Sequence, residues 1–335
     1  MCSRGGQLMP LASAASVAVR TESGQIRTVL HGRVEHGGRP LDPGDVFDLA
    51  SLSKLFTATC ALILVREGAL GLDEPVAAHL PPGTPAGRAG VTLRELLTHR
   101  SGLPAESALW REMNDPGRLR AGVLATPLRH PRGRRHEYSC VGYILAGAVL
   151  ESAAGQPLDT ILRTRLTGPL GAHSVRFGPV PARDAVATET QPTRGALRGQ
   201  IHDELAAGLA TPVGNAGLFG TARDVLRLAE LLIEDGRGPR GERILDPGSV
   251  RLLTEPGEWP GPGYGQAIGF RVNDAGLLGG ARGVGHTGFT GTSLALDPHR
   301  GRAVALLVNR VHPTRETAGI IPLRRRVHEA VFRED

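Results

Sequence analysis

The chain has 335 residues, of which 21% are charged and 40% are hydrophobic, as in ordinary soluble globular proteins. Its net charge of +6 comes from 39 basic and 33 acidic residues spread along the chain, which does not indicate nucleic-acid binding. No window approaches the roughly 18 uninterrupted apolar residues of a transmembrane helix. We therefore expect neither a nucleic acid nor a membrane as a partner.

The three cysteines, Cys2, Cys60 and Cys140, form an odd set without metal-ligand spacing. This usage fits reduced thiols in a cytoplasm. Pro10 interrupts the short apolar stretch near the N-terminus, so a signal peptide is not expected. The sequence thus predicts a cytoplasmic protein.

The first 75 residues are predicted to form a β-hairpin followed by a long helix. Two β-rich runs, 15–20 and 26–30, flank the turn sequence Glu-Ser-Gly-Gln, which is typical of a hairpin. Residues 47–67 then combine a strand-like lead-in with a Ser-x-x-Lys sequence that opens an apolar run of helix length. Two glycines and a proline at 68–75 end this helix.

The middle of the chain is predicted to be mainly helical. A short amphipathic helix with a threonine cap occupies 91–97, and apolar helices follow at 141–154 and 157–166. Residues 105–135 are polar and irregular, with helix-sized pieces. Residues 176–205 contain several prolines and glycines and are predicted to be a long irregular segment.

The C-terminal part is predicted to return to strands. A capped helix at 225–234 is followed by short β-rich runs that glycine and Asp-Pro turns interrupt, as in an antiparallel sheet. A basic helix at 320–332 closes the chain. The predicted strands are 266–272, 283–286, 292–297 and 303–309.

Strands at both ends of the chain and helices between them predict an α+β fold. The two termini would build one antiparallel sheet flanked by helices, an α/β sandwich with an inserted all-α region. We expect residues 1–75 and 225–335 to form the sheet domain and residues 76–224 the helical domain of one catalytic unit.

The Ser-x-x-Lys sequence places Ser51 and Lys54 one turn apart on the same helix face, so their side chains can approach hydrogen-bonding distance. Free backbone N–H groups and the helix dipole at the helix N-terminus favour a developing oxyanion and are expected to hold the pKa of Lys54 down. A neutral lysine could then take the serine proton. Lys54 is also the only lysine, and the other 38 basic residues are arginines, which cannot act as bases near neutral pH. The alternative interpretation is a surface lysine on an ordinary helix.

Five stretches follow one another along the chain, namely Ala50–Lys54, Leu96–Leu103, Glu137–Tyr143, Asn215–Ala222 and Gly285–Gly291. In this order they resemble the serine β-lactamase and penicillin-binding-protein superfamily. Within it, the sequence is most similar to class C β-lactamase-like esterases and D-alanyl-D-alanine carboxypeptidases. Several motifs in order are far more specific than one.

The resemblance implies a catalytic group of three residues. Ser51 matches the acylated nucleophile and Lys54 its partner. Tyr138 matches the tyrosine of a Tyr-x-Asn motif, which can shuttle the proton between nucleophile and leaving group if nearby cations lower its pKa. A core tyrosine that packs at a helix end is the alternative.

The resemblance also implies the substrate-binding side of the site. His286, Thr287 and Gly288 stand where β-lactamases carry Lys-Thr-Gly, on a strand that lines the site. The backbone N–H groups of Ser51 and Phe289 would form the oxyanion hole.

Two positions depart from the family pattern. Cys140 replaces the asparagine of Tyr-x-Asn, and a thiol is only a weak hydrogen-bonding group. His286 replaces a permanent cation, so carboxylate recognition is expected to be weaker and dependent on pH. Both changes favour an esterase, amidase or acyl-transfer enzyme with a less anionic substrate over a β-lactamase.

We therefore predict a serine hydrolase or acyltransferase that acts on a small-molecule ester or amide through acyl-Ser51, without a metal or cofactor. A ligand-binding or penicillin-sensing protein without turnover, a D-alanyl-D-alanine carboxypeptidase and a β-lactamase remain alternatives, as does Cys140 as the nucleophile. The acyl donor, the acceptor and the oligomeric state stay open.

The histidines give no sign of a metal site. None of them has tight ligand spacing with a carboxylate, so structural or surface roles are expected. The pairs considered are His130 with His136 and His99 with His202.

Overall fold

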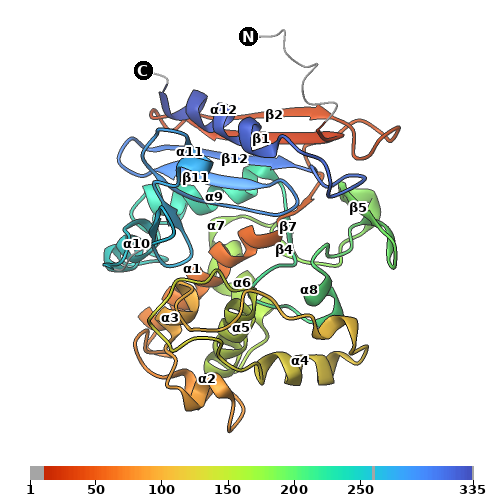
Figure 1. Ribbon diagram of the computed structural model, residues 1–335. Helices are drawn as coiled ribbons and strands as arrows, with labels where there is room; N and C mark the ends of the chain where they lie inside the picture. Colours follow the sequence, from red (N-terminus) through yellow and green to blue (C-terminus); the bar gives the residue numbers. More distant parts are fainter. Residues whose placement is uncertain (1–10, 259–260, 334–335) are drawn as a thin grey trace.

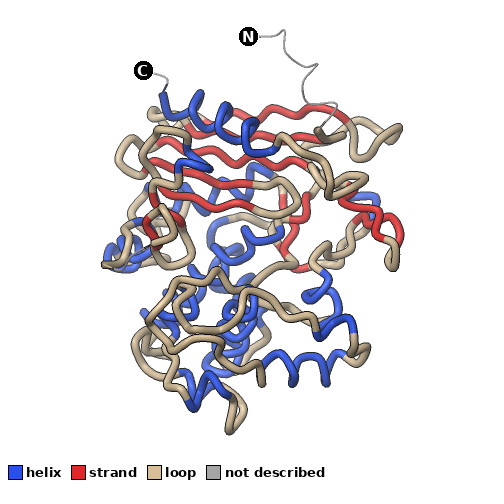
Figure 2. Tube along the Cα trace, in the orientation of Figure 1, coloured by secondary structure: helices blue, strands red, loops and turns tan. Residues whose placement is uncertain are grey.

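The computed structural model describes residues 11–258 and 261–333, so Cys2 lies outside the described part. A sheet with helices on both faces lies above a mainly helical region (Figure 1). Helix α1 (Ser53–Arg66) lies where the two layers meet. Figure 2 shows the long strands confined to the sheet layer. The predicted α+β fold is confirmed.

The main sheet is built from both ends of the chain. Its seven antiparallel strands among the described residues run in the order β2-β1-β12-β11-β10-β9-β8. The predicted pairing of N- and C-terminal strands is confirmed, because β1 pairs with β12. The strands are β1 (Ala14–Arg20), β2 (Ile26–Gly32), β8 (Gly265–Gln266), β9 (Arg271–Val272), β10 (Val284–Thr287), β11 (Ser293–Asp297) and β12 (Arg302–Val308).

Strand β12 separates two apolar layers, because successive side chains of a strand point to opposite faces. Ala305 and Leu307 belong to the main core, which includes residues of α9 (Ala222–Ile233). Leu306 packs instead with residues of α12 (Ile320–Arg333). Helices α9 and α12 therefore cover opposite faces of the sheet (Figure 1).

Helix α1 is the central element of the fold. All its residues from Ser53 to Leu64 are buried, and it packs against α5 (Cys140–Ala154) of the helical region. A helix that is apolar on every side is typical of a protein interior. Its N-terminal end therefore lies inside the protein, at the junction of the two layers.

The other helices surround α1 and the sheet. The predicted threonine cap is confirmed, since Thr92 and Glu95 form a reciprocal capping pair at the start of α3. No helix within the described ranges is long and apolar enough to cross a bilayer. These helices are α2 (Pro85–Arg88), α3 (Leu93–Leu97), α4 (Pro116–Leu124), α6 (Leu158–Leu162), α7 (Gly168–Leu170), α8 (Glu204–Leu209), α10 (Pro247–Thr254) and α11 (Ala275–Leu278).

The prediction that 176–205 is irregular is wrong in part. The segment contains the hairpin of β5 (Ala187–Gln191) and β6 (Gly195–Arg198). Distant groups hold this hairpin, because Ala187 N–H donates to Val34 O at 2.9 Å and Asn309 Nδ2 donates to Ala187 O at 3.0 Å. Such long-range contacts leave no trace in local sequence pattern.

A second, smaller sheet contains the strand that precedes α1 in the chain. Its strand order is β3-β7-β4. Strand β3 (Phe47–Asp48) comes just before the turn that contains the Ser-x-x-Lys sequence. Strand β4 (Arg176–Phe177) also belongs to the segment expected to be irregular, and it pairs with β7 (Leu218–Gly220).

The predicted strand 266–272 is likewise two short strands, β8 and β9, that pair with each other. Gly269 lies between them with φ +76°, a conformation that favours glycine. An added Cβ there would lie 2.8 Å from Ala58 Cβ of α1. Glycine is therefore required in this turn, because the backbone passes so close to helix α1.

We predict that Asn309→Ala lowers the free energy of unfolding by about 2–3 kcal/mol, because it leaves buried main-chain groups unpaired. The buried Asn309 side chain accepts from Ala14 N–H at 2.9 Å and donates to Ser13 Oγ and Ala187 O. Urea denaturation measures the change. The control Thr28→Ala, at an exposed site on β2, should change stability by less than about 0.5 kcal/mol. Equal effects of the two substitutions would contradict the prediction.

Candidate active site

The turn that carries Ser51 is held in an uncommon backbone conformation. Ala50, which precedes Ser51, has φ +45°, a value rare for a residue with a side chain. The buried carboxylate of Asp48 accepts from Ala50 N–H and from His202 N–H, both at 2.8 Å. This carboxylate, which was not recognised in the sequence, fixes the turn at the start of α1.

The structure brings together Ser51, Lys54, Tyr138 and Cys140. Lys54 Nζ lies 3.1 Å from Ser51 Oγ and 3.5 Å from Cys140 Sγ, and it donates to Asn215 O at 2.9 Å. It also lies 5.0 Å from the centre of the Tyr138 ring. Lys54 is fully buried, so the surface-lysine interpretation is wrong.

The expectation that the pKa of Lys54 is lowered is also wrong. Burial does lower it, but the neighbouring Cys140 and Tyr138, through their anionic forms and a hydrogen bond with Tyr138, raise it more. The net pKa of Lys54 lies above its ordinary value. A raised pKa favours the ammonium form of Lys54, which orients and polarises Ser51.

A buried histidine, His99, packs against Tyr138 and binds the backbone of the next residue. His99 Nδ1 accepts from Ser139 N–H at 3.0 Å, and the rings of His99 and Tyr138 lie 4.4 Å apart. Burial and the nearby Lys54 charge hold the pKa of His99 well below its usual value, which keeps Nδ1 free to accept. Ser139 caps α5 by accepting from Gly142 N–H. The sequence interpretation missed this brace.

The turn between β10 and β11 is attached to the nucleophile turn by two threonines. Thr290 Oγ1 donates to Asp48 O at 2.8 Å, and Thr292 Oγ1 donates to Leu49 O at 3.1 Å. A Cβ at Gly288 would lie 2.6 Å from Leu49 O, so only glycine allows this approach. The peptides of Ser51 and Phe289, predicted to form the oxyanion hole, thus belong to two turns that are bonded together.

His286 lies beneath the site surface. Its residue is 1% exposed, its Nδ1 lies 2.8 Å from Thr287 O, and its ring stacks on Tyr138 with centres 5.8 Å apart. Burial and the charges of Arg271 and Lys54 hold its pKa well below the usual range. His286 is therefore neutral, which corrects the expectation of a pH-dependent cation at this position.

A cavity of about 690 Å³ opens over these residues. Of the predicted site residues, it is lined by Ser51, Tyr138, Cys140, Thr287, Gly288 and Phe289. Charged side chains that the sequence interpretation did not single out also line it, namely Arg271, Arg310, Arg315, Arg324, Glu106, Asp203 and Glu204. The cavity is thus more strongly charged than we expected from the replacements at Cys140 and His286, which suggested a site for a less anionic substrate.

Arg271 places a cation near His286, the motif position that lacks a permanent charge. It comes from β9, next to β10, and its guanidinium carbon lies 5.7 Å from the Tyr138 ring centre. It forms an ion pair of 3.2 Å with Asp274, while its buried Nε has no hydrogen-bond partner among the described residues. A fixed cation therefore faces the same cavity as Ser51.

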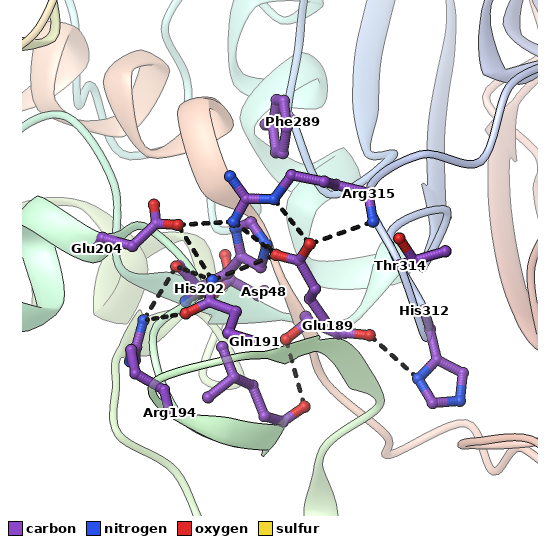
Figure 3. Close-up of polar contacts among 12 residues, drawn as sticks. Asp48, Glu189, Gln191, Arg194, His202, Glu204, Phe289, His312, Thr314 and Arg315 are labelled. Carbon is purple, nitrogen blue, oxygen red and sulfur yellow. Dashed lines mark hydrogen bonds and ion pairs between the residues drawn. The ribbon is translucent and has the colours of Figure 1, made fainter.

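An ionic network holds the far wall of the cavity (Figure 3). Arg315 binds Glu189 through two hydrogen bonds of 2.7 and 2.6 Å and Glu204 through one of 2.6 Å. Although burial opposes ionisation of Glu189, bonds from Arg315, Gln191 and His202 lower its pKa to about 2. The network joins the β5–β6 hairpin, the start of α8 and the segment after β12 into one wall.

Two exposed apolar side chains lie in the same cavity. Among the described residues, the large exposed hydrophobic side chains are Val29, Phe289 and Ile321, and the last two line the cavity. The guanidinium carbon of Arg310 lies 4.6 Å from the Phe289 ring centre and holds the ring in place. The cavity therefore offers an apolar surface as well as the Ser51 hydroxyl.

Comparison with known proteins assigns the family. The model of the Beta-lactamase family matches residues 12–329, so the chain belongs to the beta-lactamase family, whose members and structural neighbours are serine hydrolases. The predicted family resemblance is confirmed.

Three relatives illustrate its range. The chain is 29% identical over 309 residues to the "Putative D-alanyl-D-alanine carboxypeptidase" of Escherichia coli (strain K12), covering 80% of this chain and 70% of that protein. It is 30% identical over 305 residues to the "N-acetylmuramyl-L-alanine amidase" of Bacillus subtilis (strain 168), covering 80% and 68%. The solved structure of "EstCE1, a hydrolase with promiscuous acyltransferase activity" superposes with a TM-score of 0.75 at 25% identity, covering 98% and 96%.

We predict that His286 makes the protein less stable in acid. The unfolded chain binds a proton at an ordinary histidine pKa near 6.5, whereas the folded protein resists it, so stability is complete above about pH 6.5 and falls as the pH decreases. In His286→Gln, the decline of unfolding free energy between pH 7 and pH 5 should be shallower, by up to about 1.4 kcal/mol per pH unit.

Urea unfolding at several pH values measures this slope. His173→Gln, at an exposed position, is the matched control and should keep the wild-type slope. An unchanged slope in His286→Gln would show that the histidine is not held neutral.

Proposed function

We propose that this protein is a serine hydrolase or acyltransferase that acts on an ester or amide through an acyl-Ser51 intermediate. The observation that carries the proposal is the 3.1 Å contact between Ser51 Oγ and the buried Lys54 ammonium at the floor of the cavity. A buried ammonium requires strong partners, and here one partner is a hydroxyl that faces the cavity.

In the proposed reaction, Ser51 Oγ attacks the carbonyl carbon of the substrate and forms a C–O bond. The hydroxyl proton passes to the Tyr138 oxygen, which accepts it in its anionic form beside the Lys54 ammonium. The Tyr138 hydroxyl then gives this proton to the oxygen or nitrogen of the leaving group as that bond breaks. The N–H groups of Ser51 and Phe289 stabilise the negative oxygen. Water or a second nucleophile then releases the acyl group from Ser51.

The esterase or transacylase branch is supported by the cavity chemistry. Cys140 offers a thiol where an amide would bind an acylamino group, and Phe289 and Ile321 offer apolar surface. A hydrolase with acyltransferase activity is among the similar structures, and the match covers nearly the whole of both chains. We infer that an ester or amide with an apolar group is the preferred substrate.

We predict that Ser51→Ala abolishes both ester hydrolysis and covalent labelling by a fluorophosphonate, because no acyl- or phosphonyl-enzyme can form. Labelling is measured by intact mass, and hydrolysis with p-nitrophenyl butyrate. Labelling of Ser51→Ala at the wild-type stoichiometry would place the nucleophile elsewhere, with Cys140 the first residue to test. Labelled wild-type protein without sustained hydrolysis would instead indicate a sensor.

Lys54→Met is predicted to lower the second-order rate constant of fluorophosphonate labelling by about 10²-fold or more. Proton transfer from Ser51 to Tyr138 then lacks the adjacent cation, and loss of proton-transfer catalysis usually costs about 10²–10⁴-fold. The substitution removes the ammonium that contacts Ser51 but keeps a flexible apolar stem. Arg66→Met, at the exposed far end of the same helix, serves as the control and should keep the wild-type rate. A loss smaller than tenfold in Lys54→Met would make the proposed role untenable.

A carboxypeptidase is a second candidate, and Arg271 is the observation that favours it. A guanidinium beside the nucleophile can bind the terminal carboxylate of a peptide. The name of the Escherichia coli relative points in the same direction.

The two candidates differ in their response to Arg271→Gln. For a carboxypeptidase, kcat/KM for an acyl-D-alanyl-D-alanine peptide should fall at least about tenfold, while kcat/KM for neutral p-nitrophenyl butyrate stays within about twofold. For the favoured esterase or transacylase, the wild type should prefer the ester. The peptide should then be a poor substrate for both the wild type and Arg271→Gln. A wild type that prefers the peptide would replace the first candidate by the second.

A further inference from the structure

Arg324 on α12 is a buried cation without a carboxylate partner. Its residue is 7% exposed, and no ion pair joins it to a carboxylate within residues 11–258 and 261–333. Burial and the charges of Arg310 and Arg271 lower its pKa to about 10, so it remains protonated at neutral pH. A buried charge without a partner of opposite charge lowers the stability of the fold. A contribution to folding therefore does not explain why an arginine is at this position.

The hydrogen bonds of Arg324 go to one turn of the candidate site. Its Nη2 donates to Gly288 O and to Thr292 O, both at 2.8 Å. The same turn is closed by Gly288 N–H, which donates to Thr292 O at 2.8 Å. Arg324 thus attaches the C-terminal helix to the β10–β11 turn, and the guanidinium also borders the cavity.

The Gly288 carbonyl belongs to the same peptide unit as Phe289 N–H. Since the C=O and N–H of a trans peptide point in opposite directions, a donor that fixes Gly288 O also fixes the direction of Phe289 N–H. A charged donor on the carbonyl polarises the peptide and makes its N–H a stronger donor. The effect is largest where water is excluded, and Gly288 and Thr292, whose carbonyls Arg324 contacts, are both buried.

We propose that Arg324 is a positioning residue that orients and polarises the Phe289 N–H of the oxyanion hole. The proposal rests on the proposed function, because it requires an oxyanion at Ser51. Arg324 acts from behind the peptide, through Gly288, and stabilises the negative oxygen only while that oxygen exists. It should therefore affect the rate of reaction and not the affinity for substrate.

A different role would be direct binding of a substrate carboxylate, since Arg324, Arg310 and Arg271 all line the cavity. A neutral ester separates the two roles, because it carries no carboxylate for a guanidinium to bind. With such an ester, a carboxylate anchor is without effect, whereas a positioning residue is still needed.

The test compares wild type, Arg324→Met, Arg324→Lys and the control Arg325→Met, which changes the exposed neighbour on α12. Kinetics with p-nitrophenyl butyrate give kcat and KM. Inhibition by butylboronic acid reports the tetrahedral state, because the boron binds Ser51 Oγ and carries a negative oxygen. Thermal melting checks that each variant is folded.

We expect kcat of Arg324→Met to fall by about tenfold to a hundredfold, less than the 10²–10³-fold loss of an oxyanion donor itself. KM should stay within about twofold, and the boronic acid should bind more weakly by the same factor as kcat falls. Arg324→Lys, which keeps the charge, should lie between Arg324→Met and wild type, and Arg325→Met should match wild type. If Arg324→Met does not fold, Arg324→Lys decides the question by the same two measurements.

The proposal is overturned if kcat and boronic acid affinity stay at the wild-type level in a folded Arg324 variant, or if the whole loss lies in KM. Failure of the proposed function looks different. In that case the wild type itself neither hydrolyses the ester nor binds the boronic acid at Ser51, and both proposals fall together.

Discussion

Lys54 carries its charge in the interior of the protein, and its ammonium is surrounded by Ser51 Oγ, Asn215 O and Cys140 Sγ. An ammonium without such partners would cost several kcal/mol of stability. The three partners come from the turn before α1, from the loop before β7 and from the start of α5, so the charge requires these elements to meet at one point. The rest of the site is arranged around that meeting point.

The two layers of the fold deliver the partners in different ways. The helical region supplies Tyr138 and Cys140 at the N-terminal end of α5, where His99 and the Ser139 cap hold the backbone. The sheet supplies the β10–β11 turn, which Thr290 and Thr292 attach to the residues just before Ser51. The nucleophile therefore lies between a phenol from one layer and a glycine turn from the other, and neither layer could form the site alone.

Much of the fold was predictable, because the strongest signals were local. Apolar runs of helix length predicted α1 and α5, and β-rich runs between glycines predicted the C-terminal strands. The β5–β6 hairpin was missed because Val34 and Asn309, far away in the chain, hold it in place. The family resemblance carried by five motifs in order predicted which residues gather around Ser51. Spacing within a helix predicted only the approach of Lys54 to Ser51.

The electrostatic properties of the site were not predictable in this way. The charge of Lys54 and the neutrality of His286 follow from burial and from neighbours that sequence spacing does not specify. Arg271 and Arg324 reach the cavity from β9 and α12 without belonging to any motif considered. Both cations line the same cavity as Ser51.

The central claim is that Ser51 forms a covalent adduct whose negative oxygen is held by two main-chain N–H groups. A crystal structure of the protein after reaction with a fluorophosphonate tests it most directly. The account predicts phosphorus bonded to Ser51 Oγ, with the phosphonyl oxygen about 2.7–3.1 Å from both Ser51 N and Phe289 N. An adduct on another residue, or a phosphonyl oxygen that points away from both N–H groups, would contradict the account.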